Sequence, residues 1–341
     1  MIAVNERLGH RSMGLFSRWL LAAALIVLLG AEIVALAGPW LWQGDMVTPF
    51  RLQMLLAAAV LAALSVAFRQ RCLHALAVAA LVGALGPIAE RLMVRHSLPA
   101  RARGDAVSVV FANVLCDNRH YDRVTAMVRA EAPDLFLAAE TTPAWIAHLD
   151  TLADRYPYRF HAGPGVFGIA AYARRPFTAR VFRIGRHHMP LGRQEFADMV
   201  VLVAHPQPPA RRGLAAENRA YLQALARLAQ TSTKPVILAG DLNATLWSHS
   251  LAPLLDIGMQ WPAGSGLRYS WPVDRSYLMI QIDQILTRGA VAGSLRVLPD
   301  VGSDHFPVRA DLVFPRPRAP AAQPSRPPVS IRPVARGRLP E

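Results

Sequence analysis

The sequence has almost no lysine and very little cysteine. Lys234 is the only lysine among 37 basic residues, and a proline follows it. This scarcity argues against a lysine nucleophile or a Schiff base as the basis of catalysis. The two cysteines, Cys72 and Cys116, lie in different regions of the chain, so no disulfide framework is predicted. No cysteine belongs to the polar clusters described below, which argues against a zinc site built on thiolates.

A strong excess of positive charge is missing from the central part of the chain. The formal net charge is +14, but residues 104–314 carry 21 basic and 18 acidic residues and contribute only +3. Residues 1–103 contribute +6 and residues 315–341 contribute +5. A groove that binds duplex DNA normally carries a stronger basic stripe, because neutralising phosphates supplies most of the non-specific affinity. The charge distribution therefore argues mildly against a nucleic-acid substrate.

Long apolar runs are confined to the N-terminal third. Residues 15–37, 50–68 and 72–89 are each long enough to cross the hydrocarbon core of a bilayer as a helix. A cleaved signal peptide followed by buried helices is the alternative, but the first run is long and lacks a clear small-residue cleavage site. We therefore predict three transmembrane helices, with residues 1–14 ahead of them and a connector that ends at residue 103.

The arginines around these runs predict the orientation in the membrane. Positive charge favours the cytoplasmic side, which puts the N-terminus in the cytoplasm and the remainder of the chain, after three crossings, outside. Long domains translocate largely regardless of flanking charge. The residues that favour this orientation are Arg7, Arg11, Arg18, Arg69 and Arg71. The segment between the first two apolar runs has no net positive charge, because Asp45 balances Arg51. The residues that oppose this orientation are Arg91, Arg95, Arg101 and Arg103.

Beyond residue 104 the pattern changes to short apolar runs separated by turns. This mixture of strand-like runs and helical periodicity predicts one α/β domain over residues 104–314. The tail, 315–341, has eight prolines and six arginines with few bulky apolar residues, so we predict that it is disordered. The expected strands are 107–111, 135–139, 168–173, 199–204, 236–239, 282–286 and 308–313, and the expected helices are 121–130, 143–153 and 214–230, with a weaker one after Trp247.

Polar groups stand at the ends of several of these apolar runs. Asp241 and Asn243 follow the run 236–239, and their spacing of two residues points both side chains the same way in an extended backbone. Such a layout is typical of a site and not of a core. Asn113, Glu140 and His205 stand in comparable positions, Asp283 is a lone carboxylate within an apolar run, and Asp304 and His305 belong to a second polar cluster near the last apolar run.

In this order and at these separations, the polar residues resemble the motifs of the endonuclease/exonuclease/phosphatase superfamily, which includes DNase I, abasic-site endonucleases, sphingomyelinases and inositol phosphatases. The resemblance covers residues 104–314 and includes the sequences Gly-Asp-Leu-Asn-Ala and Gly-Ser-Asp-His-Phe-Pro-Val. It implies a DNase I-like fold, a four-layer α/β/β/α sandwich. With three spans ahead of it, the chain further resembles bacterial membrane-anchored members related to vancomycin- and teicoplanin-resistance membrane proteins, which implies the bacterial inner membrane.

The resemblance also implies a metal site. Glu140 is the first expected ligand, with the amide oxygen of Asn113 and the carboxylate of Asp304 as further ligands. Hard oxygen donors of this kind suit Mg²⁺ or Mn²⁺. Asn113 has a simpler interpretation as the cap of a turn.

The remaining polar residues are expected to carry the chemistry. Asp241 corresponds to the group that orients or deprotonates the attacking water, and Asn243 to one that holds the phosphate or this water. His305 corresponds to the phosphate-contacting histidine and Asp283 to the carboxylate that orients it. His205 corresponds to a general acid or transition-state donor. As alternatives, Asp283 is a buried structural partner and His205 a residue at a strand end.

These expectations lead to one functional hypothesis with two alternatives. The first is a membrane-anchored, Mg²⁺-dependent phosphoesterase or pyrophosphatase that acts with water on a phosphorylated, lipid-linked substrate. The second is an extracytoplasmic endonuclease or phosphodiesterase, which the near-neutral catalytic region disfavours. The third is a catalytically silent membrane scaffold or sensor. The sequence leaves the substrate and the oligomeric state open.

Overall fold

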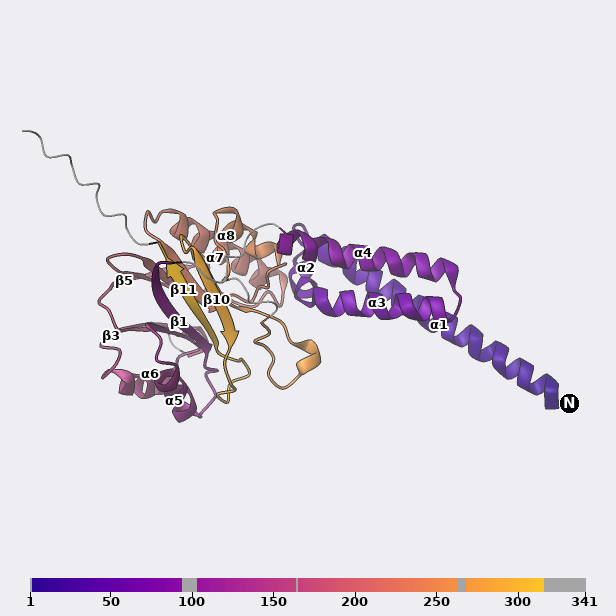
Figure 1. Cartoon of the computed structure of the whole chain (residues 1–341), viewed down its shortest axis with the longest axis horizontal. Coiled ribbons are helices and arrows are strands. Elements are labelled where there is room, and N and C mark those ends of the chain that lie inside the picture. The colour runs from indigo at the N-terminus through magenta and orange to yellow at the C-terminus, as the bar shows by residue number, and fades with distance from the viewer. Residues whose placement is uncertain (1, 94–102, 164, 263–267, 316–341) are drawn as a thin grey trace, which may run out of the picture.

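The computed structural model describes residues 2–93, 103–163, 165–262 and 268–315. Most of the tail that we predict to be disordered, 316–341, lies outside these residues, and so do Arg95 and Arg101 of the connector. A helical bundle extends from one end of an α/β domain, and the N-terminus lies at the far end of the bundle (Figure 1).

The bundle contains three long apolar helices, α1 (Ile2–Leu36), α3 (Arg51–Ala67) and α4 (Arg71–Met93). Between α1 and α3 lie the short helices α2 (Trp42–Val47) and η1 (Thr48–Phe50). The three predicted spans are confirmed as helices long and apolar enough to cross a membrane, whereas the side on which the domain lies stays a prediction. The candidate spans are Phe16–Leu36, Trp42–Ala67 and Arg71–Ala89.

An ion pair joins two of these helices inside the bundle. The guanidinium of Arg51 lies 3.3 Å from the carboxylate of Glu32, and both side chains are buried. Charged groups at membrane depth are costly unless they face a partner inside the bundle. Glu32, the acidic residue of the first apolar run, therefore has a structural partner on α3.

Two mixed β-sheets form the centre of the domain. In the six-stranded sheet the strand order is β10-β11-β1-β2-β4-β3, and in the five-stranded sheet it is β5-β6-β7-β8-β9. The first contains β1 (Asp105–Asn113), β2 (Leu135–Ala139), β3 (Tyr158–Ala162), β4 (Ile169–Ala173), β10 (Ala292–Val297) and β11 (Val308–Phe314). The second contains β5 (Thr178–Ile184), β6 (Met189–Glu195), β7 (Val200–Ala204), β8 (Val236–Asp241) and β9 (Asp283–Arg288).

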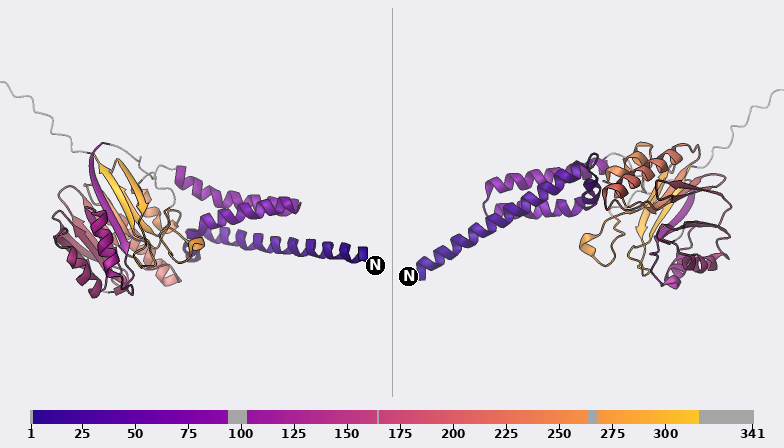
Figure 2. Two further views of the ribbon diagram at one scale, coloured as in Figure 1. Left: turned by 60° about the horizontal axis from the view of Figure 1, so that its bottom comes forward. Right: turned by 180° about the vertical axis from the view of Figure 1, so that it is seen from behind.

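Helices cover the outer face of each sheet. Helix α7 (Arg212–Gln230) buries apolar residues at helical spacing, including Tyr221, Leu222 and Leu225, against the five-stranded sheet, together with α8 (Ala252–Asp256). Helices α5 (Tyr121–Glu131) and α6 (Pro143–Leu149) cover the six-stranded sheet. A third apolar cluster lies between the two sheets. The four-layer α/β/β/α sandwich is therefore confirmed (Figures 1 and 2).

The sequence analysis did not predict four of the strands. Strands β3 and β5 lie at sheet edges, and most of their residues are exposed. Strand β6 contains a proline, a glycine and an arginine, and β10 has exposed residues among small ones. None of these segments shows the continuous apolar run by which the buried strands are recognised. The runs that did predict strands correspond to β1, β2, β4, β7, β8, β9 and β11.

The parallel strand pairs decide where the polar residues meet. Strand β1 runs parallel to β2, and β7 runs parallel to β8. The carboxyl ends of parallel neighbours lie at the same edge of a sheet, so the residues that follow these strands are brought together. Strand β9 is antiparallel to β8 and places Asp283 directly opposite Asp241.

Candidate active site

The predicted site residues come from the ends of strands in both sheets. Asn113 ends β1 and Glu140 follows β2 in the six-stranded sheet, whereas His205 follows β7 and Asp241 ends β8 in the five-stranded sheet. Asn243 lies just after β8, Asp283 begins β9, and the loop before β11 carries Asp304 and His305. Side chains that are up to 192 residues apart in the sequence therefore lie within hydrogen-bonding distance.

Asn113 connects the two sheets. Its side-chain Nδ2 donates to Glu140 Oε1 at 2.9 Å and to Asp241 Oδ2 at 3.1 Å. Its Oδ1 accepts the backbone N–H of Leu115 at 3.1 Å. One buried amide thus bridges two carboxylates, which lowers the cost of placing them together. In this orientation the amide oxygen expected to bind metal faces a backbone donor instead, as in the turn-capping interpretation.

Glu140 and Asn243 adopt left-handed backbone conformations, with φ of 60° and 49°. This region is tolerable for asparagine but costs about 1 kcal/mol for a residue such as glutamate. Two contacts hold Glu140 in place: its Oε1 accepts from Asn113 and its Oε2 accepts the backbone N–H of Cys116 at 3.1 Å. Strain that the surroundings maintain in this way is typical of functional sites.

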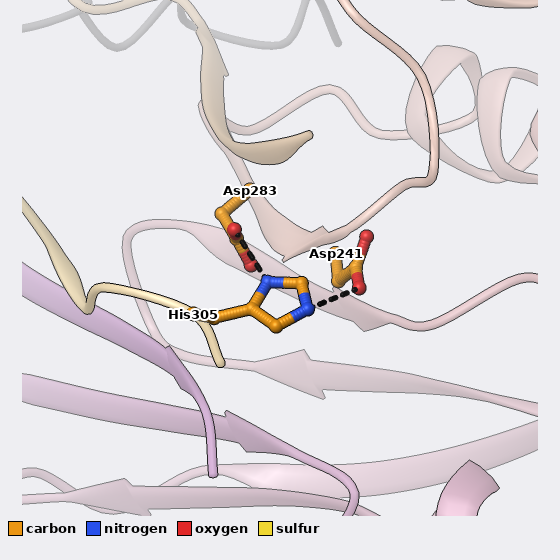
Figure 3. A group of neighbouring side chains, drawn as sticks. All are labelled: Asp241, Asp283 and His305. Carbon is orange, nitrogen blue, oxygen red and sulfur yellow. Dashed lines mark hydrogen bonds and ion pairs between the residues drawn. The ribbon is translucent and has the colours of Figure 1, made fainter. Parts of the chain in front are cut away.

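His305 lies between two aspartates (Figure 3). Its Nδ1 is 2.8 Å from Asp283 Oδ2, and its Nε2 is 3.7 Å from Asp241 Oδ2. Burial alone would lower the pKa of His305, but the charge and hydrogen bond of Asp283, followed by the charge of Asp241, raise it to about 10. The imidazole is therefore positively charged at neutral pH, with Nε2 directed at the site.

Asp241 is 2% exposed and lies between two imidazoles. His205 Nε2 is 3.6 Å from the same oxygen, Oδ2, that His305 approaches. The other oxygen, Oδ1, accepts the backbone N–H of Asn243 at 2.9 Å. Burial raises the pKa of Asp241, and the charge of Asp283 adds to this, whereas the two histidines oppose it. The Asp241 carboxylate is therefore buried, and its oxygen Oδ2 faces both histidines.

Two other side chains fix the loop that carries Asp304 and His305. The Ser303 hydroxyl donates to the carbonyl of Asn113 at 2.8 Å and accepts the backbone N–H of His305 at 3.1 Å. The indole N–H of Trp271 donates to Asp304 Oδ2 at 3.0 Å. The sequence analysis did not assign these roles to Ser303 and Trp271. In the sequence, Ser303 is marked only by its position directly before the Asp304-His305 pair. Trp271 is marked only by the Ser-Trp-Pro sequence in which it lies.

The donor atoms at this site suit a hard divalent cation. Within the described residues, ligand atoms of Asp241, Asp283 and His305 all lie within 4.8 Å of one another; because His305 is protonated, the two carboxylates are the members of this group that can bind a cation. Two buried carboxylate oxygens, Asp283 Oδ1 and Asp304 Oδ1, have no hydrogen-bond partner among the described residues. Carboxylate and amide oxygens are the ligands that Mg²⁺ and Mn²⁺ prefer. The site therefore fits such an ion, while the expected ligands Glu140, Asn113 and Asp304 stay predictions.

The site opens into a cavity of about 530 Å³. On one side of this cavity are polar residues of the strand ends, including Glu140, Asp241, Asn243, His205 and His305. The amide of Asn243 donates to the carbonyl of Pro206 at 3.1 Å. Phe167 and Trp271 stand beside the two histidines, with ring centroids 6.1 and 6.2 Å away. The arrangement presents two imidazoles and at least two carboxylates to a ligand in a mostly apolar cavity.

Solved structures of other proteins resemble this chain in fold. A conserved protein of unknown function from Enterococcus faecalis is 16% identical, with a TM-score of 0.51 over 61% of this chain and 99% of that one. SmcL is 15% identical, with a TM-score of 0.50 over 61% of this chain and 99% of its own. Beta toxin from Staphylococcus aureus, in a structure with bound magnesium ions, is 15% identical, with a TM-score of 0.49 over 60% and 99% of the two chains.

At these identities the solved structures show a shared fold. A comparison with curated proteins found no match. Residues 110–305, more than half of the chain, match the Endonuclease/Exonuclease/phosphatase family. The chain belongs to this family, and its domain has the DNase I-like fold.

Proposed function

We propose that the protein is a membrane-anchored, Mg²⁺-dependent phosphoesterase or pyrophosphatase that directs water at the phosphate of a lipid-linked substrate. The proposal includes a relation to the bacterial membrane proteins of vancomycin and teicoplanin resistance, and a catalytic domain outside the cytoplasm. The observation that carries it is the buried Asp241 carboxylate, which lies within 3.7 Å of two histidine Nε2 atoms in a cavity beside the membrane helices.

The two histidines are suited to stabilise negative charge on a phosphate. His305 is protonated at neutral pH because Asp283 raises its pKa to about 10, so its Nε2–H is available to a non-bridging oxygen. His205 presents Nε2 from the other side of Asp241. Donors fixed in a buried site stabilise the charge that develops in the transition state without further reorganisation. His205 would donate to the leaving oxygen; its Nδ1 has no hydrogen-bond partner among the described residues, whereas Asp283 holds that of His305.

Asp241 is suited to orient the attacking water and accept its proton. Burial raises its pKa, which makes the carboxylate a better base near neutral pH. The backbone N–H of Asn243 holds Oδ1, so Oδ2 faces the reaction. Asn243 thus fixes the base, and its amide at the cavity wall is also placed to contact the phosphate.

Glu140, Asn113 and Asp304 are the residues that would hold Mg²⁺. The ion would supply positive charge to the phosphate oxygens and lower the pKa of a bound water. For Asn113 this role needs the amide to turn, because its Oδ1 faces Leu115 in the arrangement described above. Glu140 is already fixed through both carboxylate oxygens.

The test is hydrolysis by the detergent-solubilised full-length protein. Phosphate release from undecaprenyl pyrophosphate and from phospholipids would be measured beside nicking of plasmid DNA, each with Mg²⁺ and with EDTA. We expect metal-dependent release from a lipid substrate, no nicking, and a loss of at least about 10³-fold in Asp241→Ala. The matched control is Asp274→Ala, which removes an exposed carboxylate and should retain activity.

Two outcomes would contradict the proposal. Nicking without lipid hydrolysis would make the protein a nuclease. No metal-dependent turnover of any substrate, in a protein that unfolds cooperatively, would favour a silent scaffold or sensor.

A further inference from the structure

One wall of the active-site cavity comes from the membrane region. The connection between α1 and α3, residues 37–50, contains α2 and η1 and lies where the bundle meets the domain (Figure 1). We call it the first connection. Four of its residues line the same cavity as Asp241 and His305: Asp45, Met46, Pro49 and Phe50.

Arg219 of α7 holds this connection on the domain. Its Nε lies 2.7 Å from the carboxylate of Asp45, and a second guanidinium nitrogen donates to the carbonyl of Gly38 at 2.6 Å. Asp45 is only 2% exposed. A buried ion pair with additional hydrogen bonds is sensitive to geometry, so it fixes the relative position of its two segments.

Close packing adds to this ion pair. His249 Nε2 lies 3.0 Å from the carbonyl of Ala35 at the end of α1. A Cβ atom on Gly38 would clash with the ring of His249, so a larger residue at this position would displace that ring. Next to the first connection, the side chain of Gln53 on α3 donates to the carbonyl of Met279 at 3.0 Å. The first connection therefore has a defined position over the site.

The lining of the cavity favours an apolar ligand next to a phosphate. Apart from its histidines, no described residue that lines the cavity is basic. A nucleic-acid backbone, with several phosphates, would find no arginine or lysine there. Met46 is 42% exposed, and Phe50 and Ile280 also line the cavity, so apolar side chains face an open space beside the polar residues. A cavity with both polar and apolar lining residues is suited to a ligand that has a polar group and an apolar chain.

We propose that the first connection recognises the apolar chain that adjoins the substrate's phosphate, with Met46 and Phe50 as specificity-determining residues and the Asp45–Arg219 pair as the contact that positions them. This inference rests on the proposed phosphoesterase function. It makes the membrane region a part of the substrate site in addition to an anchor. The substrate class is a phosphate ester or pyrophosphate of a long-chain apolar alcohol.

The experiment is a chain-length series on the full-length protein in nanodiscs with Mg²⁺. Methyl, butyl and octyl p-nitrophenyl phosphates share one leaving group and differ only in the alkyl chain. We expect kcat/KM to rise at least about tenfold from methyl to octyl, as burial of two methylene groups would give. In Phe50→Ala and in Met46→Ala this octyl-to-methyl ratio should fall to about threefold or less, because the chain loses its contacts. Leu41→Ala, which removes an exposed side chain of the same connection away from the cavity, should keep the ratio.

Binding of alkyl phosphonates, which cannot be hydrolysed, separates the two proposals. Dissociation constants for methyl and octyl phosphonate would be measured by calorimetry on the same variants. Chain-dependent binding that Phe50→Ala abolishes, without turnover of any ester, would support the inference and overturn the phosphoesterase function. Turnover with equal kcat/KM across the series, or a ratio unchanged in both Phe50→Ala and Met46→Ala, would overturn the inference and leave the function standing. Because Met46 is exposed, its variant tests the idea even where Phe50→Ala fails to fold.

Discussion

Replacement of Asp283 by asparagine removes the negative charge beside His305 and keeps the shape of the side chain. The amide oxygen can still accept the Nδ1–H that the carboxylate accepts at 2.8 Å. Burial lowers the pKa of His305, and Asp283 is the strongest of the charges that outweigh it. In Asp283→Asn we therefore expect the pKa of His305 to fall well below 10, so that the ring loses its charge at a lower pH.

The size of the effect follows from the shift itself. A rise from 6.5 to about 10 corresponds to about 5 kcal/mol of preference for the charged imidazole. Because the folded-state pKa is the higher one, this stabilisation is complete below pH 6.5 and is lost as the pH rises through about 10. Removing Asp283 also removes the cost of burying its charge, so we expect a net loss of about 2–3 kcal/mol in unfolding free energy at pH 7.

The assay is an NMR titration of the histidine rings in the detergent-solubilised protein with EDTA. His305→Gln identifies the resonance among the 11 histidines. The control is Asp304→Asn, because this carboxylate is 44% exposed and 3.9 Å from His305 Nε2, and its loss should lower the pKa much less. A resonance of His305 that still titrates near pH 10 in Asp283→Asn would refute the argument.

Two further variants test contacts outside the Asp283–His305 pair. Arg219→Ala leaves the buried carboxylate of Asp45 without its ionic partner, so we expect a loss of about 1–3 kcal/mol, measured as a lower thermal unfolding midpoint. Partial burial, followed by the charge of Glu140, raises the pKa of the Cys116 thiol. With EDTA at pH 8, Glu140→Gln should therefore make Cys116 react severalfold faster with iodoacetamide, in a Cys72→Ser background.

For each of these two expectations, one outcome would contradict it. An unchanged midpoint in Arg219→Ala, judged against the exposed Arg212→Ala, would mean that the ion pair does not hold the first connection. An unchanged alkylation rate in Glu140→Gln would mean that the charge of Glu140 does not control the reactivity of the Cys116 thiol.

The position of the site could be predicted in part because Asn113, Glu140, His205 and Asp241 each end or directly follow an apolar strand. Asn113 and Asp241 are 128 residues apart, yet they bond directly, since each ends a strand with a parallel neighbour. The pairing of Asp283 with His305 came from the family resemblance, because no spacing rule connects a strand start with a loop. The contacts of Ser303 and Trp271 depend on how one loop folds over another, which has no periodic signal.

The role of the first connection was hidden for a physical reason. In the sequence, residues 37–50 lie between two of the predicted spans, and their partners lie far away along the chain. Arg219 is 174 residues from Asp45, and we interpreted neither residue as part of a pair. Edge strands such as β5 were missed for a related reason. Most of their side chains are exposed, so their sequence lacks the apolar pattern of a strand that packs in a sheet.

The same contacts connect the membrane spans to the chemistry of the site. Arg219 lies on α7, whose buried face packs on the sheet that carries Asp241, and Ile88 of α4 belongs to the same apolar cluster. The position of Asp241 relative to the N-terminal helices is thus fixed by packing between the helices and the domain. If the proposed function holds, an enzyme held in this way would meet a lipid phosphate confined to the same surface at a high effective concentration. Removing the spans would therefore also remove a wall of the cavity, so the isolated domain should differ from the full-length protein in its choice of substrate as well as in its location.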